Sequence, residues 1–187
     1  MKDKASQLPL RLRKKHGTGQ RLDVTAADGG RLVRAQSLRN ATVGGLISII
    51  VFSMLWIMLS LLLNRVFPWM TVLLGAVLGF VVQRAGRGVD WRFPTLAAGL
   101  TLVGALAANI VVAASYTAET FDTGTLHILK SVTSMTWPVF FDEVWSVADG
   151  FYAVLAASVA AFLANRRLSR SQYYALRLWR AESDRHQ

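Results

Sequence analysis

The chain has 187 residues and no cysteine, 53% of its residues are hydrophobic and 17% are charged, and 21 Lys and Arg face 11 Asp and Glu. Because the apolar and the charged residues are segregated into separate blocks, this composition excludes an ordinary soluble domain and indicates a small polytopic membrane protein. The lack of cysteine also excludes disulfides, thiolate metal sites, iron–sulfur clusters and cysteine nucleophiles.

The first 41 residues are polar and basic and contain no apolar run that could form a core. They predict a disordered cytoplasmic tail over residues 1–41. The first long apolar run begins at Val43 and extends over about 21 residues, whereas the apolar core of a signal peptide has only about 7–15. We therefore expect this run to be a membrane span and not a cleaved leader.

Four apolar segments approach the roughly 17–25 residues that a helix needs to cross a bilayer. The second is the weakest, because it is short and starts with Pro68, although proline is tolerated in the first turn of a helix. Three spans are therefore the alternative. The expected fold is all-α, with four transmembrane helices in residues 42–165, at about 43–63, 66–82, 95–116 and 147–164.

Basic residues are sorted to one side of this four-span arrangement. The tail, the 83–92 loop and the C-terminal segment carry every Lys and Arg except Arg65 and Lys130. Since cytoplasmic loops are enriched in Lys and Arg, both termini are expected in the cytoplasm. Attraction of these basic residues to anionic lipid headgroups explains the net charge of +10. A nucleic acid is therefore disfavoured as the partner.

Two segments outside the spans are expected to lie along the membrane surface. Within the outer loop, residues 117–146, the aromatic stretch that begins at Trp137 predicts an interfacial helix, with a plain loop as the alternative. At the other end, residues 166–187 interleave arginines with apolar residues. They predict a basic amphipathic cytoplasmic helix that continues the last span.

The hydrophobic cores of the spans contain no Asp, Glu, Lys, Arg or His. Because ionisable groups in a bilayer usually serve a function, their absence argues against proton-coupled transport, voltage sensing and intramembrane acid/base chemistry. The histidines His16, His127 and His186 all lie outside the spans. We therefore expect no catalytic residue, no cofactor and no metal.

Asn109 and Ser53 are the polar residues inside the spans that we single out. An amide in hydrocarbon needs a hydrogen-bond partner, so Asn109 is expected to bond a neighbouring helix. A role of Asn109 and the serines in binding a substrate is the alternative.

Small residues at helical spacing recur in the later three spans, where they let helix backbones approach closely. Packing within one bundle and packing against another protein are both compatible with this pattern. The expected packing positions are Gly75, Gly79, Gly99, Gly104, Ala108, Ala153, Ala157 and Ala161.

A basic turn joins the second and third spans. Gly86 and Gly88 are expected to permit the tight turn through their backbone freedom, and neighbouring arginines to anchor it to lipid phosphates. A specific lipid or nucleotide phosphate bound by these arginines and the glycine amides is the alternative. The expected contacts with anionic lipid are Arg84, Arg87, Arg92, Arg166 and Arg167.

The stretch Leu74–Phe93 resembles a segment of uncharacterised bacterial four-span inner-membrane proteins, in which a small-residue G-x-x-x-G helix runs into a basic G-x-G turn and an Arg-Phe pair. The similarity continues weakly through Leu100–Asn109 and Phe140-Phe141-Asp142, and covers about residues 66–168. It implies a multi-pass protein of the bacterial inner membrane and no assigned activity. Some members carry a zinc ribbon or a GYF-like module, but this chain lacks the cysteines of a zinc ribbon.

Three functions remain open at this point. The first is a non-catalytic inner-membrane subunit or scaffold that forms a homo-oligomer or joins a larger membrane-protein complex. The second is a small homo-oligomeric transporter or channel, since one bundle of this size encloses little pore. The third is a membrane enzyme acting on lipids through Asp142, Glu143 and His127, which has the least support.

Overall fold

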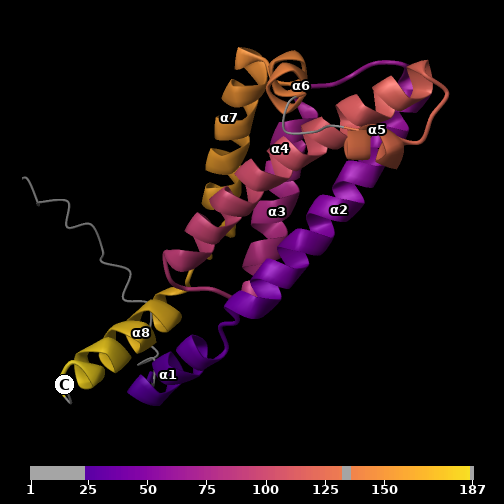
Figure 1. The fold of residues 1–187 in the computed structure, drawn as a ribbon. Helices are drawn as coiled ribbons and strands as arrows, with labels where there is room; N and C mark the ends of the chain where they lie inside the picture. Colours follow the sequence, from indigo (N-terminus) through magenta and orange to yellow (C-terminus); the bar gives the residue numbers. More distant parts are fainter. Residues whose placement is uncertain (1–23, 132–135, 186–187) are drawn as a thin grey trace, which may run out of the picture.

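The computed structural model describes residues 24–131 and 136–185, which form helices and connecting segments and no strand. The all-α prediction is confirmed over these residues. Figure 1 shows a long helical bundle with shorter helices at both of its ends. The helices are α1 (Ala26–Arg34), α2 (Leu38–Leu63), α3 (Met70–Gly86), α4 (Arg92–Thr120), α5 (Thr125–Ser131), α6 (Trp137–Val144), α7 (Val147–Ala164) and α8 (Arg170–Ser183).

Three of the bundle helices, α2, α4 and α7, are long and apolar enough to cross a membrane. The fourth, α3, has 17 residues. At 1.5 Å per residue it is roughly 25 Å long, somewhat less than a hydrocarbon core of about 30 Å. It starts at Met70, later than expected, because the residues from Asn64 to Trp69 form the turn that follows α2.

The bundle is built around α3 and α4, each of which contacts both α2 and α7. Their side chains form two apolar clusters, the first with residues of all four helices and the second with residues of α2, α3 and α4. One lies toward α1 and α8 and contains Ala41, Val82, Phe93, Ala97, Ala160 and Ala164. The other lies toward α5 and α6 and contains Trp56, Met70, Ala108 and Val112.

The segment before the bundle contradicts the prediction of a disordered tail in part. Residues 1–23 lie outside the described residues, but Ala26–Arg34 form α1, which packs against α8 (Figure 1). Gly29 and Gly30 of α1 are buried, and a Cβ at Gly29 would overlap the backbone of Ala175 in α8. Because this partner is distant in the sequence, the local polar composition could not reveal the helix.

The C-terminal helix also differs from expectation, because it does not continue the last span. α7 ends at Ala164, Asn165 adopts an extended backbone, and Ser169 begins α8 by accepting a hydrogen bond from the Gln172 amide at 3.3 Å. Serine is a favoured residue for starting a helix in this way. The break turns α8 aside so that it meets α1.

Two polar contacts connect the residue at the start of α2 and helix α8 to the rest of the bundle. The Ser37 amide donates to the Gly86 carbonyl at 3.0 Å, which joins the start of α2 to the end of α3. Arg180 of α8 lies 3.5 Å from the Asp90 carboxylate in the turn before α4. The Arg180–Asp90 ion pair therefore connects α8 to the turn between α3 and α4.

Candidate functional site

A cavity of about 860 Å³ lies among the residues at the ends of α3, α7 and α1. We call it the arginine pocket, because Arg84, Arg87, Arg166 and Arg167 all line it. Arg84 lies in the last turn of α3 and Arg87 directly follows that helix, whereas Arg166 and Arg167 follow α7. The remaining lining residues are Leu32, Ala35, Gln83, Phe162, Leu163 and Asn165.

Two hydrogen bonds hold the two sides of the pocket together. The Gln83 side-chain amide donates to the Asn165 carbonyl at 3.2 Å, and a guanidinium N–H of Arg166 donates to the Arg87 carbonyl at 3.5 Å. Both bonds join the end of α3 to the residues that follow α7. The two segments that carry the four arginines are therefore held next to each other.

The turn after α3 differs in detail from its prediction. The residue with left-handed backbone is Arg87, with φ of 48°, whereas no described glycine has a positive φ. Gly86 and Gly88 serve a different purpose, because a Cβ at either position would collide with the ring of Phe93. The glycines thus provide space for a buried phenylalanine, and Arg87 adopts a conformation that costs a non-glycine residue roughly 1–2 kcal/mol.

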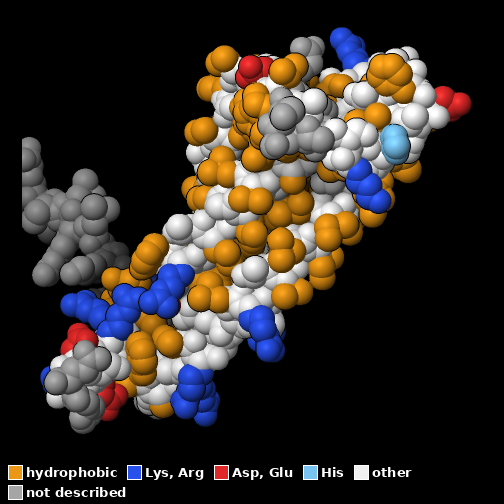
Figure 2. All heavy atoms as spheres, viewed as in Figure 1, with side chains coloured by type: hydrophobic (Ala, Val, Ile, Leu, Met, Phe, Trp, Pro, Cys, Tyr) orange, Lys and Arg blue, Asp and Glu red, His pale blue; other side chains and the backbone are white. Residues whose placement is uncertain are grey.

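The charge in the pocket is uncompensated within the described part of the chain. The ion pairs recorded there join Arg31 to Asp28 and Arg180 to Asp90, and neither includes a pocket arginine. Arg84 instead lies over the ring of Phe80, 4.7 Å from its centroid. Figure 2 shows Lys and Arg side chains gathered at this end of the molecule. Several guanidinium groups without a counter-ion form a surface suited to an anion with several oxygens.

Of the five arginines predicted to contact anionic lipid, the fold separates one from the others. Arg92 lies at the start of α4 and lines a smaller cavity of about 190 Å³ with Asp90, Gln36 and Phe93. The sequence predicted that Arg84, Arg87, Arg166 and Arg167 contact anionic lipid. Their positions along the chain did not predict that they line one pocket. Leu32 and Phe162, which give the pocket apolar walls, were not singled out at all.

The small residues predicted for packing mostly meet inside this chain. Gly75 and Gly79 of α3 lie against the backbones of Ala156 and Ala160 of α7, and Gly104 of α4 lies against Ile49 of α2. Ala108, Ala153 and Ala157 are buried and Ala161 is half-buried. On α7, Ala156, Ala160 and Ala164 are more completely buried than Ala153, Ala157 and Ala161. Gly99 is the exception, because it is exposed and nothing lies within 4 Å of where its Cβ would be.

The polar side chains inside the bundle are not paired as predicted. Asn109 is buried, but its side-chain NH₂ has no hydrogen-bond partner among the described residues. The indole N–H of Trp56 and the hydroxyls of Ser60 and Thr71 are likewise buried and unpaired there. Ser53 is half-buried. These unpaired groups lie in or next to the apolar cluster around Trp56, on α2, α3 and α4.

The residues considered for enzyme chemistry lie at the opposite end of the bundle. His127 of α5 and Asp142 of α6 are both exposed, and the side chain of Glu143 lies outside the described residues. Within residues 24–131 and 136–185, no group of three His, Asp or Glu side chains is arranged to hold a metal ion.

Comparison with known proteins yields no relative: no protein-family model, no curated protein and no solved structure matches this chain.

Proposed function

We propose that this protein is a non-catalytic integral membrane scaffold, whose bundle spans the bilayer and whose α1–α8 pair forms a rigid basic platform at the cytoplasmic surface. The observation that carries the proposal is the direct packing of α1 on α8, with Gly29 against Ala175 and Trp179. Such a platform gives a peripheral protein or an anionic leaflet a fixed surface to bind. Sorting of Lys and Arg to this end favours the cytoplasm for both termini.

The same contact supports four spans. Because α1 and α8 lie side by side, the chain enters and leaves the bundle at one end and must cross it an even number of times. The three long helices need α3 as the fourth span, and mild thinning of the bilayer accommodates its length. The resemblance of Leu74–Phe93 to bacterial four-span proteins suggests the bacterial inner membrane.

Impermeant maleimide labelling tests this topology on a chain that has no cysteine of its own. Single cysteines are introduced at four exposed positions, Val66, Trp91, Thr123 and Ala181. Four spans place Val66 and Thr123 on one side and Trp91 and Ala181 on the other. Labelling of Val66 and Trp91 from the same side would contradict a crossing by α3.

The partner is expected to bind the platform or the outward face of α2. α2 packs on α3 and α4 and not on α7. It exposes apolar side chains along its length, among them Val43, Ile47, Ile50, Met54 and Met58. Purification from native membranes in mild detergent, with identification of co-purifying proteins, tests the scaffold. A stoichiometric partner that is lost on removal of residues 170–187 supports the proposal, and a particle that contains a single copy of this chain and no other protein contradicts it.

A transporter or channel is the second candidate, favoured by four polar groups inside the bundle that have no hydrogen-bond partner among the described residues. Buried polar groups without partners are costly and suggest that water or a solute reaches them. Solute flux into proteoliposomes that is abolished by Asn109→Leu would favour this candidate over the scaffold.

A further inference from the structure

We propose that the arginine pocket is a specific site for the phosphate group of an anionic phospholipid. This inference deepens the proposed membrane function and rests on it for the presence of lipid. It differs from general attraction of basic residues to a bilayer, because it assigns one headgroup to one cavity with a defined set of side chains.

The charged wall of the pocket fits a phosphate. Four arginines line it, and none of them forms an ion pair with a carboxylate among the described residues. Guanidinium groups donate paired hydrogen bonds that match the oxygens of a phosphate, and a bound anion would also relieve the repulsion among the arginines. The bonds from Gln83 to Asn165 and from Arg166 to Arg87 hold the two basic sides in place before any ligand arrives.

The apolar wall of the pocket favours a lipid over a free phosphate. Phe162 lines the pocket and is 70% exposed, so its ring belongs both to the cavity and to the outer surface of α7. Phe151 and Leu155 are exposed on the same helical face, since they precede Phe162 by eleven and seven residues. An acyl chain can follow this apolar face away from the pocket while its phosphate remains among the arginines.

The size of the pocket is compatible with a headgroup. Its volume of about 860 Å³ lies within the range of about 300–1,000 Å³ that is typical of small-molecule sites. The site lies at the α1–α8 end of the bundle, where the proposed topology places the headgroups of the cytoplasmic leaflet.

Native mass spectrometry of the full chain in detergent tests the site, with phosphatidylglycerol as the anionic probe and phosphatidylcholine as the zwitterionic one. The variant is Arg84→Gln with Arg167→Gln, because both side chains are exposed and neither donates a hydrogen bond to another described residue. Its charge-matched control is Arg39→Gln with Arg177→Gln, two exposed arginines outside the pocket. Thermal unfolding of each variant verifies that it is folded.

We expect the unmodified chain to retain one phosphatidylglycerol in preference to phosphatidylcholine. The pocket variant should bind phosphatidylglycerol at least tenfold more weakly. The affinity of the control should lie within twofold of that of the unmodified chain. Equal losses in the variant and the control, or no preference for the anionic lipid, would overturn the specific site. If the double variant does not fold, the single charge reversal Arg167→Glu gives the same comparison against Arg177→Glu.

Glycerol phosphate, which has the anionic group without acyl chains, separates a lipid from a soluble phosphate. We expect it to compete weakly, and we expect Phe162→Ser to weaken binding of phosphatidylglycerol without changing that of glycerol phosphate. Glycerol phosphate that binds as tightly as the lipid would overturn the lipid assignment. Maleimide labelling tests the membrane topology separately, so loss of the pocket and loss of the proposed topology are distinguishable.

Discussion

Gly75 of α3 lies so close to Ala156 of α7 that a Cβ on the glycine would overlap the alanine carbonyl oxygen. One helical turn later, Gly79 meets Ala160 in the same way, with its Cβ position 2.6 Å from the carbonyl oxygen. Lipid tails are as apolar as the helix surfaces, so burying apolar side chains between helices adds little driving force for association. This close backbone approach instead provides the van der Waals contact that holds the helices together. The α3–α7 contact is therefore a major element of bundle stability.

Gly75→Ala is expected to destabilise the bundle, because the obstructing atoms belong to the backbone of Ala156 and cannot rotate away. Overpacking of this kind costs typically about 1–3 kcal/mol. Unfolding of the purified protein in detergent measures the change. Gly99→Ala is the matched control, since nothing lies within 4 Å of that position, and a similar loss in both variants would contradict the assignment.

Gly29→Ala is expected to separate α1 from α8 while leaving the bundle intact. A Cβ at Gly29 would overlap the Ala175 backbone and approach the Trp179 Cβ at 2.7 Å. Spin labels at Ala27→Cys and Ala181→Cys, both exposed, report the distance between the two helices. The distance distribution should broaden in the variant. Gly124→Ala, where nothing lies within 4 Å, should leave it unchanged.

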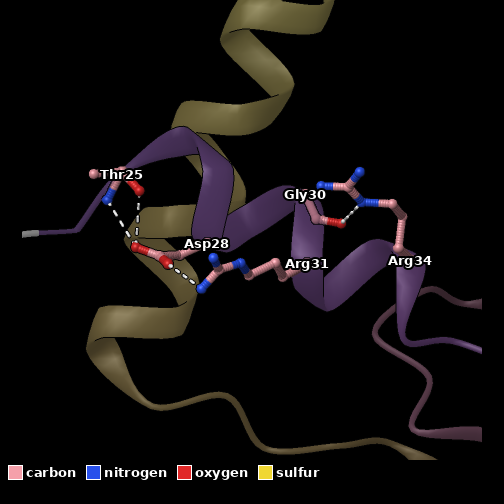
Figure 3. A network of polar contacts seen from close by, with 5 residues as sticks. All are labelled: Thr25, Asp28, Gly30, Arg31 and Arg34. Atoms are coloured by element: carbon pink, nitrogen blue, oxygen red, sulfur yellow. Dashed lines mark hydrogen bonds and ion pairs between the residues drawn. The ribbon is translucent and has the colours of Figure 1, made fainter.

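Acid is also expected to loosen α1. The Thr25 amide and hydroxyl donate to the Asp28 carboxylate at 3.1 and 2.9 Å, and Arg31 lies 3.9 Å away (Figure 3). The hydrogen bonds from Thr25, followed by the charge of Arg31, lower the pKa of Asp28. Because the folded pKa lies below the unfolded one, this stabilisation is present above a pH of about 4 and is lost as the pH falls through the folded pKa.

The same pair of spin labels measures this pH dependence. In the unmodified chain, the distance distribution should broaden as the pH falls below about 4, the usual value for an aspartate. Asp28→Asn should be broader already at neutral pH and should respond less to acid. An identical acid response in Asp28→Asn would show that other groups control the platform.

Asn109→Leu is expected to leave stability unchanged or to raise it, because the replaced NH₂ group is buried without a partner among the described residues. Tyr116→Phe is the contrasting variant. The Tyr116 hydroxyl donates to the Ser60 carbonyl at 2.8 Å, and loss of such a bond costs about 0.5–1.5 kcal/mol. Unfolding in detergent compares the two. A larger loss in Asn109→Leu would reveal a partner such as water or another chain.

Much of the membrane character of this protein follows from the sequence alone. Long apolar runs predict α2, α4 and α7, and α7 has the expected bounds of Val147 to Ala164. The prediction succeeds because the ability of a helix to span a bilayer depends on the length and hydrophobicity of that segment alone. The sorting of Lys and Arg between loops is equally visible in the chain order.

The tertiary structure alone decided how these segments meet. α8 packs over the glycines of α1 and supports that helix. The glycines at positions 86 and 88 leave the space that the Phe93 ring occupies. The arginine pocket joins residues about 80 positions apart, as the bond from Arg166 to Arg87 illustrates. Asn109 is buried without the predicted bond. Each of these outcomes depends on which helix faces lie together, and local composition and periodicity do not encode that choice.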